Sequence, residues 1–199
     1  MNFGVKSAIS HNIGDLVRPM NVQIRQAVET DAEAIAKLKT RSWQSAYRGQ
    51  LPDRFLDELS LDLASRIGYW RMHLSTQSSA KHEIWTAEDD RQLRGFAAFG
   101  PARRADEAEL GELYALYVDP LHWGQGVGRS LLSHAVQRLS RDHANALLWV
   151  LESNLRARRF YERAGWALDG GTKIENLPDG TELREVRYRV FCTRVKEES

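Results

Sequence analysis

Residues Leu113–Leu132 read LYALYVDPLHWGQGVGRSLL, and this stretch decides the fold. Apolar and aromatic residues fill its first six positions and predict the end of a buried strand that begins near Glu109. Asp119-Pro120 then turns the chain, and three glycines precede an amphipathic helix expected over 127–140. The stretch therefore predicts a strand, a glycine-rich turn and the N-terminus of a helix in direct succession.

This succession is suited to binding an anion. Glycine lets the backbone approach a ligand closely, and the free N–H groups and dipole of a helix N-terminus favour phosphate. No acidic residue occurs from Leu121 to Arg141, although the first turn of a helix normally collects Asp and Glu. Arg129 stands where its charge opposes the helix dipole. A helix face that is merely cationic and solvated is the alternative interpretation.

Two familiar phosphate-binding loops do not fit the spacing. A Walker A loop ends in Gly-Lys-Ser or Gly-Lys-Thr, whereas here Gly128 is followed by Arg129. A dinucleotide-binding loop needs glycines two and five positions after the first. If Gly124 is the first glycine, the last one should stand at position 129, which is Arg129. If Gly126 is the first, the last one should stand at position 131, which is Leu131. Neither loop is therefore predicted.

Outward from this stretch, strand-like and helix-like segments alternate along the chain. Thr30 and Glu33 have the spacing of a capping box at the start of a helix that reaches Tyr47. The other expected helices lie near residues 52–59, 63–74 and 155–164. The other expected strands lie at 22–27, 83–87, 93–99, 146–151, 167–168 and 181–191. This alternation indicates an α/β or α+β architecture around a mixed sheet.

The central stretch resembles the acetyl-CoA signature of the GCN5-related N-acetyltransferases, whose core motif is Arg/Gln-x-x-Gly-x-Gly/Ala. Here the motif reads WGQGVG over residues 123–128, with Trp123 in place of Arg or Gln. This difference removes a polar side chain near the pyrophosphate and leaves the backbone N–H groups in place. A second family signature, Asn-x-x-Ala-x-x-Phe-Tyr-x-x-x-Gly-Phe/Trp, is similar to residues 154–166. The resemblance extends from about Ile24 to Phe191.

The resemblance implies a fold and a cosubstrate. It implies one α/β (α+β) N-acetyltransferase domain over residues 21–199, with a mixed, mostly antiparallel sheet of about six to seven strands flanked by helices. In this family two neighbouring strands splay apart, and the pantetheine arm of acetyl-CoA lies between them. The residues then expected to contact acetyl-CoA are Leu116, Tyr117, Val118, Trp123, Gly124, Gln125, Gly126, Val127, Gly128, Arg129, Asn154 and Tyr161.

Acetyl transfer to an amine needs a proton acceptor and a proton donor. Glu112 stands six residues before Val118, where several family members carry a general-base glutamate. Strand alternation predicts that it shares a face with Tyr114 and Leu116, and a solvated charge at the strand end is its alternative role. Tyr161 lies on the apolar stripe of its helix, and the resemblance makes it the proton donor to the departing thiolate. A tyrosine that only packs in the core is the alternative for Tyr161.

The acceptor side of the site is less specific. Trp43 and Tyr47, at the end of the first long helix, fall where the family has the wall that faces the acceptor. For each of them, core packing is the alternative role. The fold does not choose among the amines that different relatives acetylate.

Composition excludes several other classes of protein. The chain has 42% hydrophobic and 28% charged residues, as globular proteins do, and a net charge of +1 gives no basic excess for nucleic acid. No apolar run is long enough to cross a membrane, and no Cys/His cluster has metal-binding spacing. A single cysteine, Cys192, suits a reducing cytoplasm. Residues 1–20 lack the apolar core of a signal peptide and are interpreted as a flexible leader.

The sequence thus predicts an N-acetyltransferase that uses acetyl-CoA and no metal to acetylate a primary amine of a small molecule or peptide. Direct attack is expected, because no cysteine lies near the motifs to form an acyl-enzyme. Homodimers are frequent in the family, so the resemblance also makes a homodimer an expectation. Two alternatives stay open: a sensor that binds CoA or acyl-CoA without catalysis, and an interaction module of the same fold.

Overall fold

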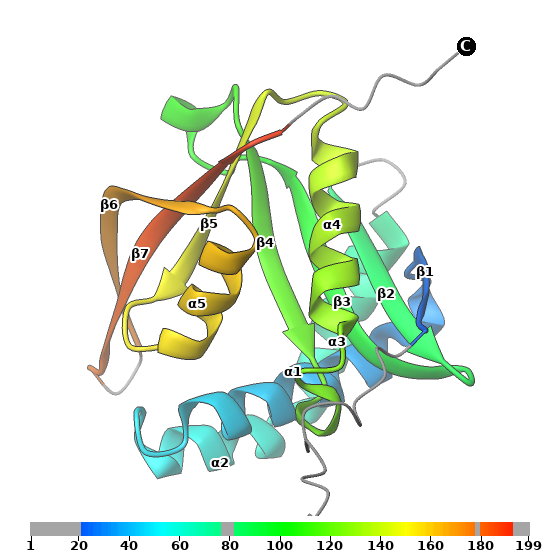
Figure 1. The fold of residues 1–199 in the computed structure, drawn as a ribbon. Helices are drawn as coiled ribbons and strands as arrows, with labels where there is room; N and C mark the ends of the chain where they lie inside the picture. Colours follow the sequence, from blue (N-terminus) through cyan, green and yellow to red (C-terminus); the bar gives the residue numbers. More distant parts are fainter. Residues whose placement is uncertain (1–20, 77–81, 178–179, 193–199) are drawn as a thin grey trace, which may run out of the picture.

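Seven strands form one sheet in residues 21–76, 82–177 and 180–192, the part of the chain that the structure, a computed structural model, describes (Figure 1). The strands are β1 (Gln23–Gln26), β2 (Glu83–Asp89), β3 (Gln92–Pro101), β4 (Gly111–Val118), β5 (Asn145–Leu151), β6 (Ala167–Asn176) and β7 (Glu182–Phe191). The helices are α1 (Ala32–Tyr47), α2 (Asp53–Leu61), α3 (Leu63–Thr76), α4 (Val127–Leu139) and α5 (Leu155–Arg163). The expected leader, residues 1–20, lies outside the described residues.

The sheet is mixed and mostly antiparallel, as predicted. Its strand order is β1-β2-β3-β4-β5-β7-β6. Between the strands that the structure describes, only β4 and β5 pair in parallel. The parallel pair needs a long crossover connection, and α4 supplies it.

Helices cover both faces of this sheet (Figure 1). On one face α4 and α5 pack against the central strands, and a buried stripe of α4 recurs every four positions at Val127, Leu131, Ala135 and Leu139. On the other face α1 and α3 enclose a second apolar core around Ile35, Leu38, Trp70 and Phe96. The two cores hold β3 and β4 between helices on both sides.

The start of α1 differs from the prediction. Thr30 and Glu33 do not form a capping box, because a short 3₁₀ turn precedes the helix and no side chain caps its first turn. Asp31 instead accepts a hydrogen bond from the N–H of Val28 at 2.8 Å and pairs with Arg25 at 2.7 Å. The carboxylate of Asp31, directly before the helix, therefore fixes the entry to it.

Strand β6 is longer than the expected piece at residues 167–168. It continues to Asn176 and pairs with β7, with an irregularity between Leu168 and Thr172 where Gly170 has a φ of +86°. Most of its side chains are exposed, so an apolar pattern does not mark the strand.

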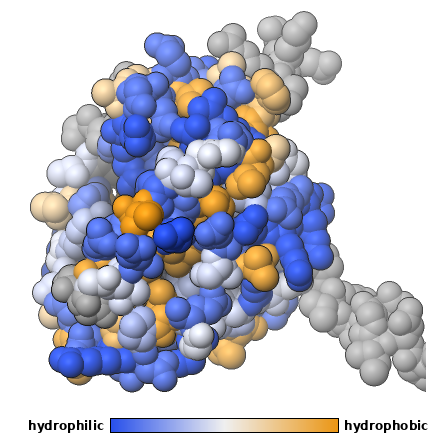
Figure 2. All heavy atoms as spheres, turned by 90° about the vertical axis from the view of Figure 1, so that its left-hand side faces the viewer, coloured by the Kyte–Doolittle hydropathy of each residue, from blue (hydrophilic) through white to orange (hydrophobic). Residues whose placement is uncertain are grey.

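Charged side chains join β6 to β7. Asp169 binds the guanidinium groups of both Arg187 and Arg189, and Lys173 pairs with Glu185 at 2.8 Å. Figure 2 looks onto this side of the molecule and shows mostly hydrophilic residues with hydrophobic ones scattered among them. Cross-strand ion pairs therefore support the hairpin in addition to its backbone ladder.

Strands β4 and β5 separate after a short paired section. They pair only over residues 111–113 of β4, although β4 continues to Val118. A bulge accompanies the divergence, because β3 pairs with Leu113 and Ala115 and skips Tyr114 between them. The predicted splay of two neighbouring strands is confirmed, and it opens the sheet between β4 and β5.

Candidate active site

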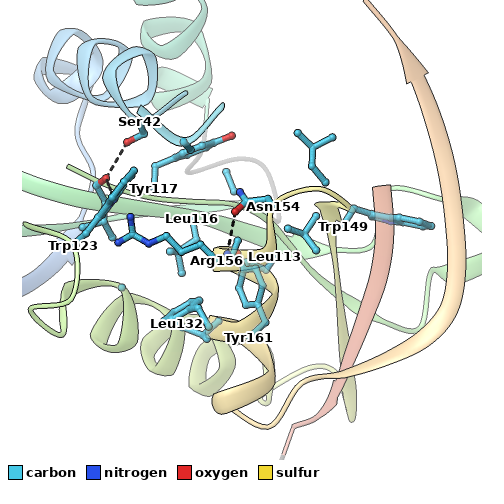
Figure 3. A pocket seen from close by; sticks show the side chains of 18 of the residues that line it. Ser42, Leu113, Leu116, Tyr117, Trp123, Leu132, Trp149, Asn154, Arg156 and Tyr161 are labelled. Atoms are coloured by element: carbon cyan, nitrogen blue, oxygen red, sulfur yellow. Dashed lines mark hydrogen bonds between the residues drawn. The ribbon is translucent and has the colours of Figure 1, made fainter. Parts of the chain in front are cut away.

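A cavity of about 1320 Å³ occupies the opening between β4 and β5 (Figure 3). Its walls come from α1, the end of β4, the glycine turn before α4 and the start of α5. The end of β5 and the β6–β7 hairpin complete the wall. Because α1 and α5 lie on opposite faces of the sheet, the cavity connects the two faces.

The glycine turn leaves backbone donors free at one end of the cavity. Gly124 and Gly126 have φ values of +77° and +88°, which residues with a side chain rarely adopt. Helix α4 begins directly after Gly126, and no side chain caps it. The N–H groups of Val127, Gly128 and Arg129 therefore have no acceptor within the helix. A phosphate at this end of the cavity would meet these donors and the positive end of the helix dipole.

Backbone groups of β4 also face the opening. The N–H of Asp119 donates to a carbonyl of β3 at 2.8 Å, so alternation directs the backbone of Tyr117 to β3 as well. Contrary to expectation, the backbone of Tyr117 is therefore occupied by its pair with Phe96, although its side chain lines the cavity. Leu116 and Val118 point their backbone groups the other way, into the gap. Leu116 thus offers both a donor and an acceptor to an extended ligand.

The carbonyl of Val118 is already used within the protein. The hydroxyl of Ser42 and the indole N–H of Trp123 each donate to it at 2.9 Å. Figure 3 shows the Ser42 bond, which reaches from α1 to the end of β4. Trp123 therefore fixes the glycine turn to β4, a structural role for the residue that departs from the family motif.

Arg156 of α5 lies over the indole of Trp123. The centre of its guanidinium group is 3.6 Å from the ring centroid, and Figure 3 shows the side chain reaching along the cavity toward the indole. In the part of the chain that the structure describes, Arg156 makes no ion pair. A cation is thus present next to the free N–H groups of the turn, although position 123 itself provides none.

Tyr161 faces the cavity from α5. Its side chain is 8% exposed, and its ring packs against Phe160 and Trp166 with centroids 5.1 and 6.2 Å away. Burial, with a smaller contribution from the nearby Tyr47, raises the pKa of the Tyr161 hydroxyl above its ordinary value. Its hydroxyl has no hydrogen-bond partner in residues 21–76, 82–177 or 180–192. The group is therefore protonated at neutral pH and available to a ligand.

Asn154 joins the two sides of the cavity. Its Oδ1 accepts the N–H of Ala157 at 3.0 Å and caps α5 (Figure 3). Its Nδ2 donates to the hydroxyl of Tyr47 at 3.1 Å. One helical turn before Tyr47, the indole of Trp43 donates to the hydroxyl of Tyr117 at 2.9 Å. The structure thus brings the two residues expected on the acceptor side to the cavity wall and bonds each to another element.

Glu112 does not line the cavity. Only 2% of it is exposed, and its carboxylate accepts the backbone N–H of Arg103 at 2.9 Å and pairs with the guanidinium group of the same residue. Arg103 also lies over the ring of Tyr114, whereas Leu116 packs into the core of the opposite face. The expected common face of Glu112 and Leu116 is wrong because the bulge shifts the alternation. The structure gives no contact through which this carboxylate would reach an amine in the cavity.

Of the residues predicted to contact acetyl-CoA, all except Gln125 and Val127 line the cavity. The side chain of Gln125 bonds a loop carbonyl and Val127 is fully buried, so these two offer only backbone groups. The sequence prediction missed Ser42 and Lys39, which line the cavity from α1. The spacing of Lys39 to Ser42 and Trp43 could have identified them, because residues three and four positions apart lie on the same face of a helix.

Metal-binding clusters and membrane-spanning helices are both absent from the described ranges. No three His, Cys, Asp or Glu side chains gather there to hold a metal ion. None of the helices in those ranges is long and apolar enough to cross a membrane.

Comparison with known proteins gives consistent matches. A sequence model described as the acetyltransferase (GNAT) family matches residues 34–166. A probable N-acetyltransferase of Mycobacterium tuberculosis is 29% identical over 178 residues, which cover 88% of this chain and 97% of that protein. An uncharacterized N-acetyltransferase of Bacillus subtilis is 31% identical over 135 residues, which cover 67% of this chain and 73% of that protein. Among solved structures, the fold matches the PaiA N-acetyltransferase of Thermoplasma acidophilum in complex with coenzyme A, with a TM-score of 0.66 and 20% identity. The match covers 86% of this chain and 99% of that one.

Proposed function

This chain belongs to the acetyltransferase (GNAT) family, and on that basis we propose that it transfers the acetyl group of acetyl-CoA to a primary amine of a small molecule or peptide. One observation carries the proposal. A single cavity joins the uncapped glycine turn, the gap-facing backbone of Leu116 and the side chain of Tyr161. These three features support a phosphate site, a channel and a proton donor within one continuous space.

The residues around the opening fit acetyl-CoA. Its pyrophosphate would be held by the N–H groups of residues 127–129, next to the cation of Arg156. The free backbone N–H and C=O of Leu116 suit the amides of the pantetheine arm. When bound, acetyl-CoA supplies an acetyl group activated as a thioester.

Tyr161 is the proposed proton donor. Its hydroxyl stays protonated because the cavity wall buries it, and it has no competing partner in the described residues. It would donate its proton to the sulfur that leaves as a neutral amine takes the acetyl group, and the proton that the amine loses would return through solvent water to the tyrosine oxygen. General acid help of this kind accelerates a reaction by roughly 10²–10⁴-fold.

The opposite wall suits an amine. Glu175 and Glu185 line the cavity from the β6–β7 hairpin. A primary amine is a cation in neutral water, and Glu175, which makes no ion pair in the described residues, provides its counter-charge, whereas Glu185 is already paired with Lys173. Trp43 and Tyr47 add an aromatic wall for the carbon skeleton of the acceptor.

A CoA sensor without catalysis is the second candidate. It would use the glycine turn and the gap in the same way. Such a sensor has no need for the hydroxyl of Tyr161, which has no structural partner in the ranges described. That unbonded hydroxyl favours the enzyme over the sensor.

The proposal is tested with acetyl-CoA and a panel of primary amines. Each amine is matched with the alcohol that has a hydroxyl group in its place, and the release of free CoA thiol is measured. We expect amines to release thiol about tenfold faster than their alcohols, or more. Equal release with amine and alcohol would contradict an amine acceptor, and no release above the hydrolysis background would favour the sensor.

A further inference from the structure

Lys39 is a cation in the cavity wall that makes no ion pair with any residue that the structure describes. The other lysines in the ranges that the structure describes are paired, Lys37 with Glu33 at 2.6 Å and Lys173 with Glu185 at 2.8 Å. Lys39 lines the cavity from α1, yet in those same ranges it makes neither an ion pair nor a hydrogen bond. Its partly buried ammonium group therefore lacks the partner that such groups normally have.

Two aromatic rings hold this ammonium group in position. Its Nζ lies 5.7 Å from the ring centroids of both Trp70 in α3 and Tyr117 in β4. The distances are near the outer limit for a cation–π contact, so the rings compensate only part of the lost hydration. The position is on the α1 side of the sheet, away from the glycine turn.

A second cation, Arg66 of α3, acts electrostatically on Lys39 but does not line the cavity. The Nε of Arg66 in α3 is buried without a hydrogen-bond partner, and its guanidinium group makes no ion pair in the described residues. Burial lowers the pKa of Lys39, and the positive charge of Arg66 lowers it further, while Glu175 across the cavity acts in the opposite direction. Two neighbouring cations that make no ion pair in the described residues, and that only Glu175 opposes, are unfavourable, and an anionic ligand would relieve this cost.

We propose that Lys39 binds a carboxylate group of the acceptor, so that the acceptor carries both an amine and a carboxylate. The inference rests on the proposed function, because it uses the acceptor end of the same cavity. Glu175 would then face the amine while Lys39 faces the carboxylate. The cavity wall is complementary to an amino acid or a molecule of that type.

Binding of the acetylated product tests this without turnover. Several N-acetyl-L-amino acids and their C-terminal amides are titrated calorimetrically into the parent protein in the presence of CoA. We expect each acid to bind about tenfold more tightly than its amide, or better. This ratio should fall to within about twofold in Lys39→Met and be largely restored in Lys39→Arg, because a carboxylate binds either cation.

Lys37→Met is the matched control, since Lys37 is exposed on the same helix and paired with Glu33. It should keep the parental ratio of affinities. Equal binding of acid and amide by the parent, no binding of any acid, or a ratio that survives in Lys39→Met would overturn the carboxylate subsite.

Thiol release with the free amino acids and their amides separates this inference from the proposed function. If no amine releases thiol while the affinity ratio holds, the proposed function fails and the anion subsite stands. If amines are acetylated but the parent and Lys39→Met show the same acid-to-amide ratio of kcat/KM, the subsite fails and the proposed function stands.

Discussion

At the scale of single residues, the hydroxyl of Tyr161 is the group whose loss should affect chemistry alone. Tyr161→Phe keeps the ring that packs on Phe160 and Trp166 and removes only the oxygen. We expect turnover to fall about tenfold or more, with acetyl-CoA affinity and thermal stability close to those of the parent. Turnover per folded molecule and affinity are measured on one preparation. A stable variant with parental turnover would leave Tyr161 as a core residue.

The raised pKa of Tyr161 adds a pH dependence. Because burial stabilises the protonated phenol, the hydroxyl remains a proton donor at alkaline pH where a free tyrosine has begun to ionise, at about pH 10. We therefore expect no loss of turnover from this group as the pH rises toward that value. A decline in the parent that is absent in Tyr161→Phe would show that the hydroxyl ionises earlier than its burial implies.

Arg156 should act on the phosphates of acetyl-CoA. In Arg156→Gln we expect the KM for acetyl-CoA to rise about tenfold, because this guanidinium group lies over Trp123, the residue that replaces the family Arg or Gln. The KM for S-acetyl-pantetheine, which has no pyrophosphate, should not change. Arg159→Gln, an exposed change on the same helix, is the control. An equal loss with both donors would contradict a phosphate contact.

At the scale of elements, the glycine turn and α4 act together. Gly126→Val forces a side chain into a backbone conformation with a φ of +88°, which costs about 1–3 kcal/mol of stability and displaces the free N–H groups. We expect acetyl-CoA binding to weaken about tenfold or more. Gly170→Val is the matched control, because its φ is +86° and a Cβ there meets open space. Gly170→Val should lose a similar amount of stability and keep the parental affinity for acetyl-CoA. Equal affinity for acetyl-CoA in the two variants would show that the turn does not bind its phosphates.

The splayed strand makes a prediction for single amides. The N–H of Leu116 faces the gap, whereas the N–H of Tyr117 is bonded within the sheet. Hydrogen exchange followed by NMR should show that acetyl-CoA slows exchange at Leu116 strongly, since the pantetheine arm covers it. Tyr117 should be protected with and without the ligand. Unchanged exchange at Leu116 in the presence of saturating acetyl-CoA would contradict binding in the gap.

At the scale of the whole molecule, the sequence was most informative where the signal is local. The glycine turn and the start of α4 are encoded within residues 118–130, because positive φ angles require glycine and the helix stripe follows at once. Asn154 and Tyr161 belong to one short helix, so their cap and their apolar stripe are also readable in a single window. The alternation of strands and helices then indicated the mixed sheet.

The remaining features depend on contacts between distant segments. The bulge at Tyr114 is a property of the β3–β4 pair, and it turned Glu112 away from Leu116 where simple alternation placed them together. The contact of Arg156 with Trp123 joins the start of α5 to the glycine turn, which no local pattern reports. Lys39 could have been placed on the cavity wall by its helical spacing to Trp43, but its lack of a partner appears only in three dimensions.

The central claim is that this cavity holds acetyl-CoA and gives its acetyl group directly to an amine. A single-turnover experiment tests it: excess protein is mixed with acetyl-CoA labelled in the acetyl group and with pooled amino acids, and the label is followed by mass spectrometry in both the small molecules and the intact protein. The account predicts that the label passes to an amine as CoA thiol appears, with no acetylated protein preceding it. Label that stays on protein-bound acetyl-CoA, or that first appears on the protein itself, would contradict the account.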